Sequence, residues 1–111
     1  MGGTFVGTPL YVAPEMLEFN LAGTFTDLWA LGCIIYEMLV GKSPFFSKKS
    51  NEVFKKILER DIYFPPDMDK DARDLIDKLL KVNAYDRLGM ASYGDLKAHP
   101  FFVDIDFDTF D

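Results

Sequence analysis

The chain has 111 residues, of which 49% are hydrophobic and 27% charged, with 12 basic and 18 acidic side chains and a formal net charge of −6. This composition is typical of one globular domain rather than of a disordered or fibrous chain. The excess of acidic residues argues against a nucleic-acid surface. The longest strongly apolar stretch, 28–40, contains Glu37 and is shorter than the ~18–20 residues that span a bilayer. We therefore expect no membrane contact by this segment.

Cys33 is the only cysteine, which excludes an internal disulfide. Its isolation is typical of a reducing compartment, so we expect an intracellular, cytoplasmic protein. We interpret Cys33 as a small apolar core residue rather than as a reactive thiol, because it lies within an apolar run. The opening Met-Gly does not predict myristoylation, because position six is Val6 rather than Ser or Thr.

The first half of the chain predicts a loop and two helices. Residues 1–14 hold three glycines and two prolines, which is typical of an irregular loop. A short helical turn is expected at 14–17, since proline suits a first helical position. The best-defined helix covers 25–40: Thr24 and Asp27, three positions apart, match a capping box, and Gly41 supplies a left-handed stop. Apolar residues occupy nearly every face of this helix, so we expect it to be central and buried.

Three more helices are predicted in the second half. Residues 50–59 carry an apolar stripe opposite a charged one. Residues 70–82 repeat apolar side chains at the positions i, i+3, i+4, i+7 and i+8 of a helix. A short helix at about 93–98 is stopped by Pro100. No stretch alternates as a strand does, so the predicted fold is all-α. The stripes comprise Val53, Phe54, Ile57 and Leu58 in the first helix, and Ala72, Leu75, Ile76, Leu79 and Leu80 in the second.

Five short motifs together carry a family resemblance. The first, GTPLYVAPE at 7–15, resembles the end of the activation segment of a protein kinase. The others follow in the family's order and at its spacing: DLWALG at 27–32, GKSPF at 41–45, NAYDRLG at 83–89 and HPFF at 99–102. The combination covers nearly the whole chain and implies a partial kinase C-lobe that lacks the N-lobe and the catalytic loop.

The resemblance also implies a group and a division of the chain. TFVGT at 4–8 and the RLG ending of the fourth motif resemble the AGC group of serine/threonine kinases. Within it, residues 27–36 and 96–102 are most similar to the phosphoinositide-dependent protein kinases. In that family, residues 1–15 would be the end of the activation segment, 16–102 the helical C-lobe with helices F to I, and 103–111 the start of the C-terminal tail.

Four residues near the start match positions that handle phosphate or substrate in the family. Thr4 matches the activation-loop phosphosite, where an added charge is clamped by arginine; otherwise it is an ordinary exposed threonine. Thr8 matches the threonine that contacts the catalytic aspartate, although a turn-forming Thr-Pro step is the alternative. Pro9 and Leu10 would line the pocket for the residue that follows the phosphoacceptor.

Three further residues match structural positions of the family. Glu15 and Arg87 match a buried ion pair that ties the activation segment to the helical core; the alternative is two independent surface charges. Asp27 matches the aspartate that anchors the catalytic loop, and its alternative role is to cap its own helix with Thr24. His99 is expected to end a helix, because no ligands at metal-site spacing accompany it.

The motifs that bind ATP and metal are missing from these 111 residues. Phosphoryl transfer needs a glycine-rich loop, a strand lysine, a His-Arg-Asp loop and an Asp-Phe-Gly sequence. The nearest match, at 106–108, lacks the glycine and lies after the last helix. We therefore assign no catalytic, cofactor or metal residue, and expect ATP and Mg²⁺ to act only in a full-length parent.

Two kinds of function stay open at this stage. The chain is either a fragment of a serine/threonine kinase whose parent phosphorylates proteins, or a truncated, non-catalytic protein-binding module. In both cases the expected partners are protein substrates or regulatory proteins that dock on the C-lobe.

Overall fold

The structure is a computed structural model that describes residues 11–103; Thr4, Thr8, Pro9 and Leu10 lie outside this range. The described part holds the α-helices α2 (Pro14–Phe19), α3 (Thr24–Val40), α4 (Ser50–Glu59), α5 (Lys70–Leu79) and α6 (Tyr93–Lys97), and the short 3₁₀-helices η1 (Ala84–Asp86) and η2 (Pro100–Phe102). Residues 11–103 contain no strand, which confirms the predicted all-α fold.

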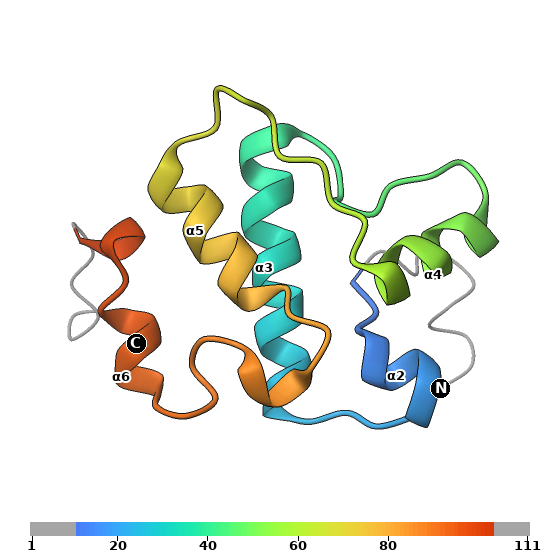
Figure 1. Ribbon diagram of the computed structural model, residues 1–111, viewed down its shortest axis with the longest axis horizontal. Helices are drawn as coiled ribbons and strands as arrows, with labels where there is room; N and C mark the ends of the chain where they lie inside the picture. Colours follow the sequence, from blue (N-terminus) through green and yellow to red (C-terminus); the bar gives the residue numbers. More distant parts are fainter. Residues whose placement is uncertain (1–10, 104–111) are drawn as a thin grey trace.

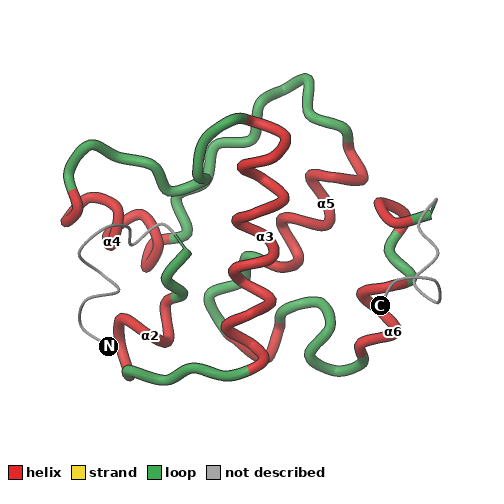
Figure 2. Tube along the Cα trace, turned by 180° about the vertical axis from the view of Figure 1, so that it is seen from behind, coloured by secondary structure: helices red, strands yellow, loops and turns green. Residues whose placement is uncertain are grey.

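Helix α3 is the centre of the arrangement. Figure 1 shows it upright, with α5 packed along one side and α2 and α4 on the other, and Figure 2 shows the same order from behind. The core forms mainly where α3 meets α5, with Trp29, Cys33 and Tyr36 buried against Leu75 and Leu79. The two helices approach closely because Gly32 faces α5: a Cβ atom at this position would lie 2.9 Å from Leu80 Cδ2.

The end of α3 agrees with the sequence, but its start does not. Gly41 ends the helix at φ 95°, in the left-handed region that glycine reaches without strain. The predicted capping box of Thr24 and Asp27 is wrong by one position, because Gly23 is the N-cap. The backbone N–H of Gly23 donates to Thr26 Oγ1 at 3.1 Å. The Thr26 hydroxyl in turn donates to Glu15 at 3.0 Å, and this tertiary contact fixes which threonine caps the helix.

Helix α5 is three residues shorter than its apolar period predicted. It ends at Leu79 because the backbone turns at Leu80, where φ is −93° and ψ is 58°. Arg60 satisfies carbonyl oxygens that the helix end leaves free: its guanidinium donates to Asp77 O at 2.8 Å and also to Leu80 O. The carboxylate of Asp77 completes this contact as an ion-pair partner of Arg60. The end of the helix is thus set by a residue at the end of α4.

The expectation that α3 is central and buried holds for one face of the helix only. Ile34, Met38 and Leu39 form an exposed apolar strip, although the opposite face is buried in the core. Likewise, the α4 stripe buries Val53 and Ile57 but leaves Leu58 exposed. Within the described residues, no helix is long and apolar enough to cross a membrane.

Candidate functional site

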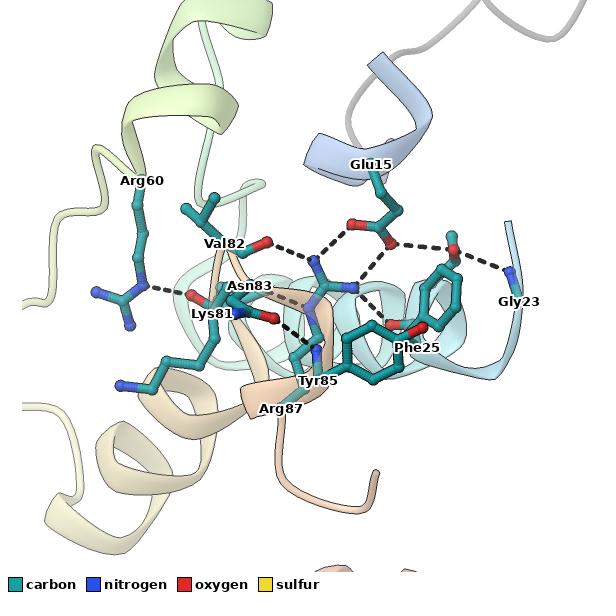
Figure 3. Close-up of polar contacts among 11 residues, drawn as sticks. Glu15, Gly23, Phe25, Arg60, Lys81, Val82, Asn83, Tyr85 and Arg87 are labelled. Atoms are coloured by element: carbon teal, nitrogen blue, oxygen red, sulfur yellow. Dashed lines mark hydrogen bonds and ion pairs between the residues drawn. The ribbon is translucent and has the colours of Figure 1, made fainter. Parts of the chain in front are cut away.

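A buried ion pair joins the start of α2 to the segment that follows η1. Arg87 Nη2 lies 2.7 Å from Glu15 Oε1, and Arg87 Nη1 lies 2.8 Å from Glu15 Oε2, so the pairing is bidentate (Figure 3). The side chains are 0% and 8% exposed for Arg87 and Glu15, respectively. The structure therefore brings together two residues that are 72 positions apart in the sequence.

The remaining donors of Arg87 also find partners. Nη1 donates to the carbonyl of Phe25 at 2.6 Å, and Nε donates to that of Lys81 at 2.8 Å. Nη2 makes a longer contact with the Val82 carbonyl at 3.5 Å. A buried guanidinium needs such partners because the desolvation of both charges otherwise cancels their attraction. Arg87 thus connects α2, the first turn of α3 and the loop after α5 through one planar group.

The surroundings of Glu15 favour its charged form. Burial acts to raise the pKa of this carboxyl group, but the hydrogen bonds donated by Arg87, by backbone N–H and by Thr26 oppose it. The pKa of Glu15 is lowered below its ordinary value of 4.5 as a result. The pair is therefore ionised at neutral pH and carries a structural role rather than an acid–base one.

Trp29 forms the apolar side of the same site. Its ring stacks on Phe45 with centroids 5.3 Å apart and planes 8° from parallel, and the Arg87 guanidinium carbon lies 5.0 Å from its ring centre. Trp29 is thus part of the buried hydrophobic core. The Trp29 Nε1 atom is buried and has no hydrogen-bond acceptor among residues 11–103.

Two polar contacts at this end of the fold escaped the sequence reasoning. The Tyr11 hydroxyl donates to the carboxylate of Glu37, which ties the segment before α2 to the central helix. This hydrogen bond raises the pKa of Tyr11. The sequence did offer a signal for Glu37, because a glutamate within an apolar helix is unusual. The second contact is the hydrogen bond from the Thr26 hydroxyl to Glu15. Nothing in the sequence pattern distinguished Thr26 from Thr24 as the residue that makes it.

The other predicted residues do not join a shared centre. Asp27 is exposed, and its carboxylate has no hydrogen-bond partner within residues 11–103. His99 caps η2: Phe101 N–H donates to its Nδ1 at 3.0 Å, and its Nε2 lies 2.7 Å from Asp74 Oδ2. Cys33 is buried, which raises the pKa of its thiol. The described part of the chain contains no cluster of three or more residues suited to hold a metal ion.

Comparison with known proteins places this arrangement in a family. The protein kinase domain family matches residues 2–102. That range contains every helix described above and both partners of the buried ion pair. The chain therefore belongs to the protein kinase domain family, and it corresponds to the C-terminal part of an AGC-group serine/threonine kinase domain.

The chain is similar to protein kinases of several organisms. The chain is 48% identical over 105 residues to 3-phosphoinositide-dependent protein kinase 1 of Mus musculus, covering 92% of the chain and 19% of that protein. The protein of the same name in Arabidopsis thaliana is 49% identical over 105 residues, covering 93% and 21%. Serine/threonine-protein kinase ksg1 of Schizosaccharomyces pombe is 45% identical over 106 residues, covering 96% and 17%. The chain thus spans about one fifth of the length of the curated relatives it matches.

Proposed function

We propose that this chain is the substrate-positioning and structural part of a serine/threonine kinase catalytic domain, which acts in a longer parent protein. That parent would use ATP to phosphorylate serine and threonine residues of protein substrates. The observation that carries the proposal is the bidentate Glu15–Arg87 pair. It fixes α2, and with it the end of the preceding segment, on the helical core.

The residues before α2 would then handle the substrate. Thr8, Pro9 and Leu10 precede the fixed helix by a few residues, which is a spacing that suits a loop held rigidly at one end. Their proposed role is to position the phosphoacceptor and the residue after it. Thr4 is the proposed activation-loop phosphosite, where a phosphate would add about −1.5 to −2 charges for an arginine to bind. In this division, residues 1–15 end the activation segment, 16–102 form the C-lobe and 103–111 begin the tail.

Asp27 is the proposed anchor for a catalytic loop. Its carboxylate is exposed at the start of α3 and has no hydrogen-bond partner in the described part of the chain. It is therefore free to accept hydrogen bonds from backbone N–H groups outside this segment. The exposed strip of Ile34, Met38 and Leu39 offers apolar surface on the same helix.

Catalysis by the chain alone is not part of the proposal. Phosphoryl transfer depends on positioning ATP and Mg²⁺ with lysine, asparagine and aspartate side chains in defined motifs. Those motifs are absent from the 111 residues. The chain supplies no proposed ligand for either ATP or Mg²⁺, so both would be bound by the rest of the parent.

Calorimetric titration of the purified chain with ATP and Mg²⁺ tests the proposal. We expect no saturable heat and no phosphate transfer to a protein substrate. Micromolar nucleotide binding would overturn it. In a parent kinase that carries this segment, Thr4→Ala should lower activity, whereas Thr4→Glu should restore part of it.

A non-catalytic protein-binding module is the second candidate function, and the exposed apolar strip on α3 favours it. Translation of the genomic DNA upstream of Met1 discriminates between the two. An in-frame Asp-Phe-Gly sequence supports the kinase, and its absence supports the module.

A further inference from the structure

A surface groove lies beside the buried Glu15–Arg87 pair, where α2, the first turn of α3 and residues 82–85 meet. Its volume is about 410 Å³, which falls within the ~300–1,000 Å³ of typical ligand pockets. Figure 3 labels Phe25, Val82 and Tyr85, which line the groove, around the ion pair. The groove is not the proposed substrate-positioning segment, which precedes α2, so a ligand there would be a further activity of the chain.

The lining of the groove is mostly apolar, and much of it is exposed. Phe19 and Leu21 from the end of α2 and the turn after it contribute large exposed side chains, as does Tyr85 from η1. Large apolar side chains gathered around a hollow typically mark an interaction site rather than an ordinary surface. Aromatic residues are also the side chains that contribute most at protein interfaces.

The charge of the groove selects the kind of occupant. Its lining includes two carboxylates, Glu15 and Glu18, and no lysine, arginine or histidine. Arg87 neutralises Glu15, whereas Glu18 is exposed and forms no ion pair within residues 11–103. One negative charge is therefore left at an apolar groove, in a chain whose net charge is −6. An occupant with an apolar side chain next to a positive charge is complementary on both counts.

We propose that this groove docks a short peptide segment of a protein partner in which a large apolar side chain is adjacent to lysine or arginine. A second copy of this chain is a poorer occupant, since two chains of charge −6 repel each other. An anionic lipid surface is disfavoured for the same reason. The proposal concerns binding alone and does not depend on kinase activity.

The test uses the ¹⁵N-labelled 111-residue chain and a synthetic peptide, acetyl-Gly-Lys-Phe-Leu-Lys-Gly-amide, followed by NMR. We expect saturable shifts of backbone signals at the groove, with a Kd of roughly 0.1–1 mM, as suits a ligand of this size. A peptide with glutamate in place of both lysines should bind at least about tenfold more weakly, and so should one with serine in place of Phe-Leu. High salt should weaken binding of the original lysine peptide, because it screens the exposed charge of Glu18.

Matched variants locate the site. Glu18→Lys should weaken the parent peptide at least about fivefold, whereas Glu59→Lys, an exposed acidic residue on α4, should not. Phe19→Ala, at a side chain 67% exposed, should also weaken it, whereas Tyr63→Ala, 66% exposed and outside the groove, should not. All four positions are exposed, so spectra of folded proteins are expected; if Glu18→Lys loses signal dispersion, Glu18→Gln replaces it.

Three results would overturn the proposal. The first is equal affinity for the lysine and glutamate peptides, which would remove the electrostatic argument. The second is the absence of saturable shifts at the groove, or unchanged binding by the Glu18 variant. The third is movement of the groove signals with chain concentration and no peptide present, which would identify a second copy as the occupant.

Discussion

The guanidinium group of Arg87 lies 5.0 Å from the ring centre of Trp29 while its terminal nitrogens bind Glu15. The same side chain is therefore part of the polar network and of the aromatic packing on α3. A cation near an indole ring gains further attraction when both are shielded from water. This arrangement makes Arg87 the residue through which α2, α3 and the loop after α5 depend on one another.

Replacement of Arg87 should be severe even when the charge is kept. Arg87→Lys retains a positive charge but cannot form the bidentate contact or reach the carbonyls of Phe25 and Lys81. We expect it to lower the free energy of unfolding by about 2–3 kcal/mol, and Arg87→Ala by about 3–5 kcal/mol. Urea unfolding monitored by circular dichroism measures both. Lys55→Ala, on the exposed face of α4, is the control and should change stability by less than ~0.5 kcal/mol. A similarly small effect of Arg87→Lys would contradict the structural role.

The ion pair also predicts acid sensitivity. The pKa of Glu15 is lower in the folded chain than its ordinary value of 4.5, so the unfolded chain takes up its proton first. The stabilisation is therefore complete well above pH 4.5 and is lost as the pH falls through the lower, folded pKa. Unfolding measured between pH 7 and pH 3 should show this loss in the parent chain. Glu15→Gln should be less stable at pH 7 and should lose less on acidification; parallel curves for the two chains would rule out the assignment.

Because α3 packs closely against α5, adding even one methyl group at Gly32 should lower the stability of the fold. In Gly32→Ala the new methyl group would lie 3.0 Å from Leu79 Cβ, which the backbone holds in place, and 2.9 Å from Leu80 Cδ2. We expect a net destabilisation of about 1–2 kcal/mol, since overpacking outweighs the gain in helix propensity. Gly94→Ala on α6 is the matched control, because its nearest neighbour, Ser92 Oγ, would be 3.4 Å away. Thermal unfolding should place the first variant below the parent and the second at or above it.

Two substitutions on α3 distinguish its exposed apolar strip from its buried face. Met38 is 78% exposed, whereas Ile35 is 7% exposed. Met38→Lys should leave stability within ~0.5 kcal/mol and reduce self-association, because it interrupts an exposed apolar patch. Ile35→Lys should prevent cooperative unfolding, since it buries an unpaired charge. Light scattering and thermal melts measure the two effects. A folded, cooperative Ile35→Lys chain would show that the core does not form as described.

Local sequence signals predicted helix bounds correctly where residues within or next to the helix decide them. Helix α4 has the predicted bounds, and Gly41 ends α3 because glycine adopts a positive φ at little cost. Helix α5 was predicted too long because its apolar period continues to Leu80, whereas the backbone leaves the helix at that residue. Arg60, some twenty positions earlier, binds the carbonyl of that residue, and no periodicity within the helix contains this information.

By itself the sequence determined an all-α chain, its kinase family and the pairing expected of Glu15 with Arg87, because these follow from periodicity and from motifs in a fixed order. Tertiary structure alone decided that Thr26 rather than Thr24 caps α3, because the choice depends on a hydrogen bond to Glu15 from another helix. It also decided which apolar residues of α3 stay exposed, among them Met38. Exposure depends on which elements pack around a helix, and hydrophobicity along the chain does not record the direction from which they approach.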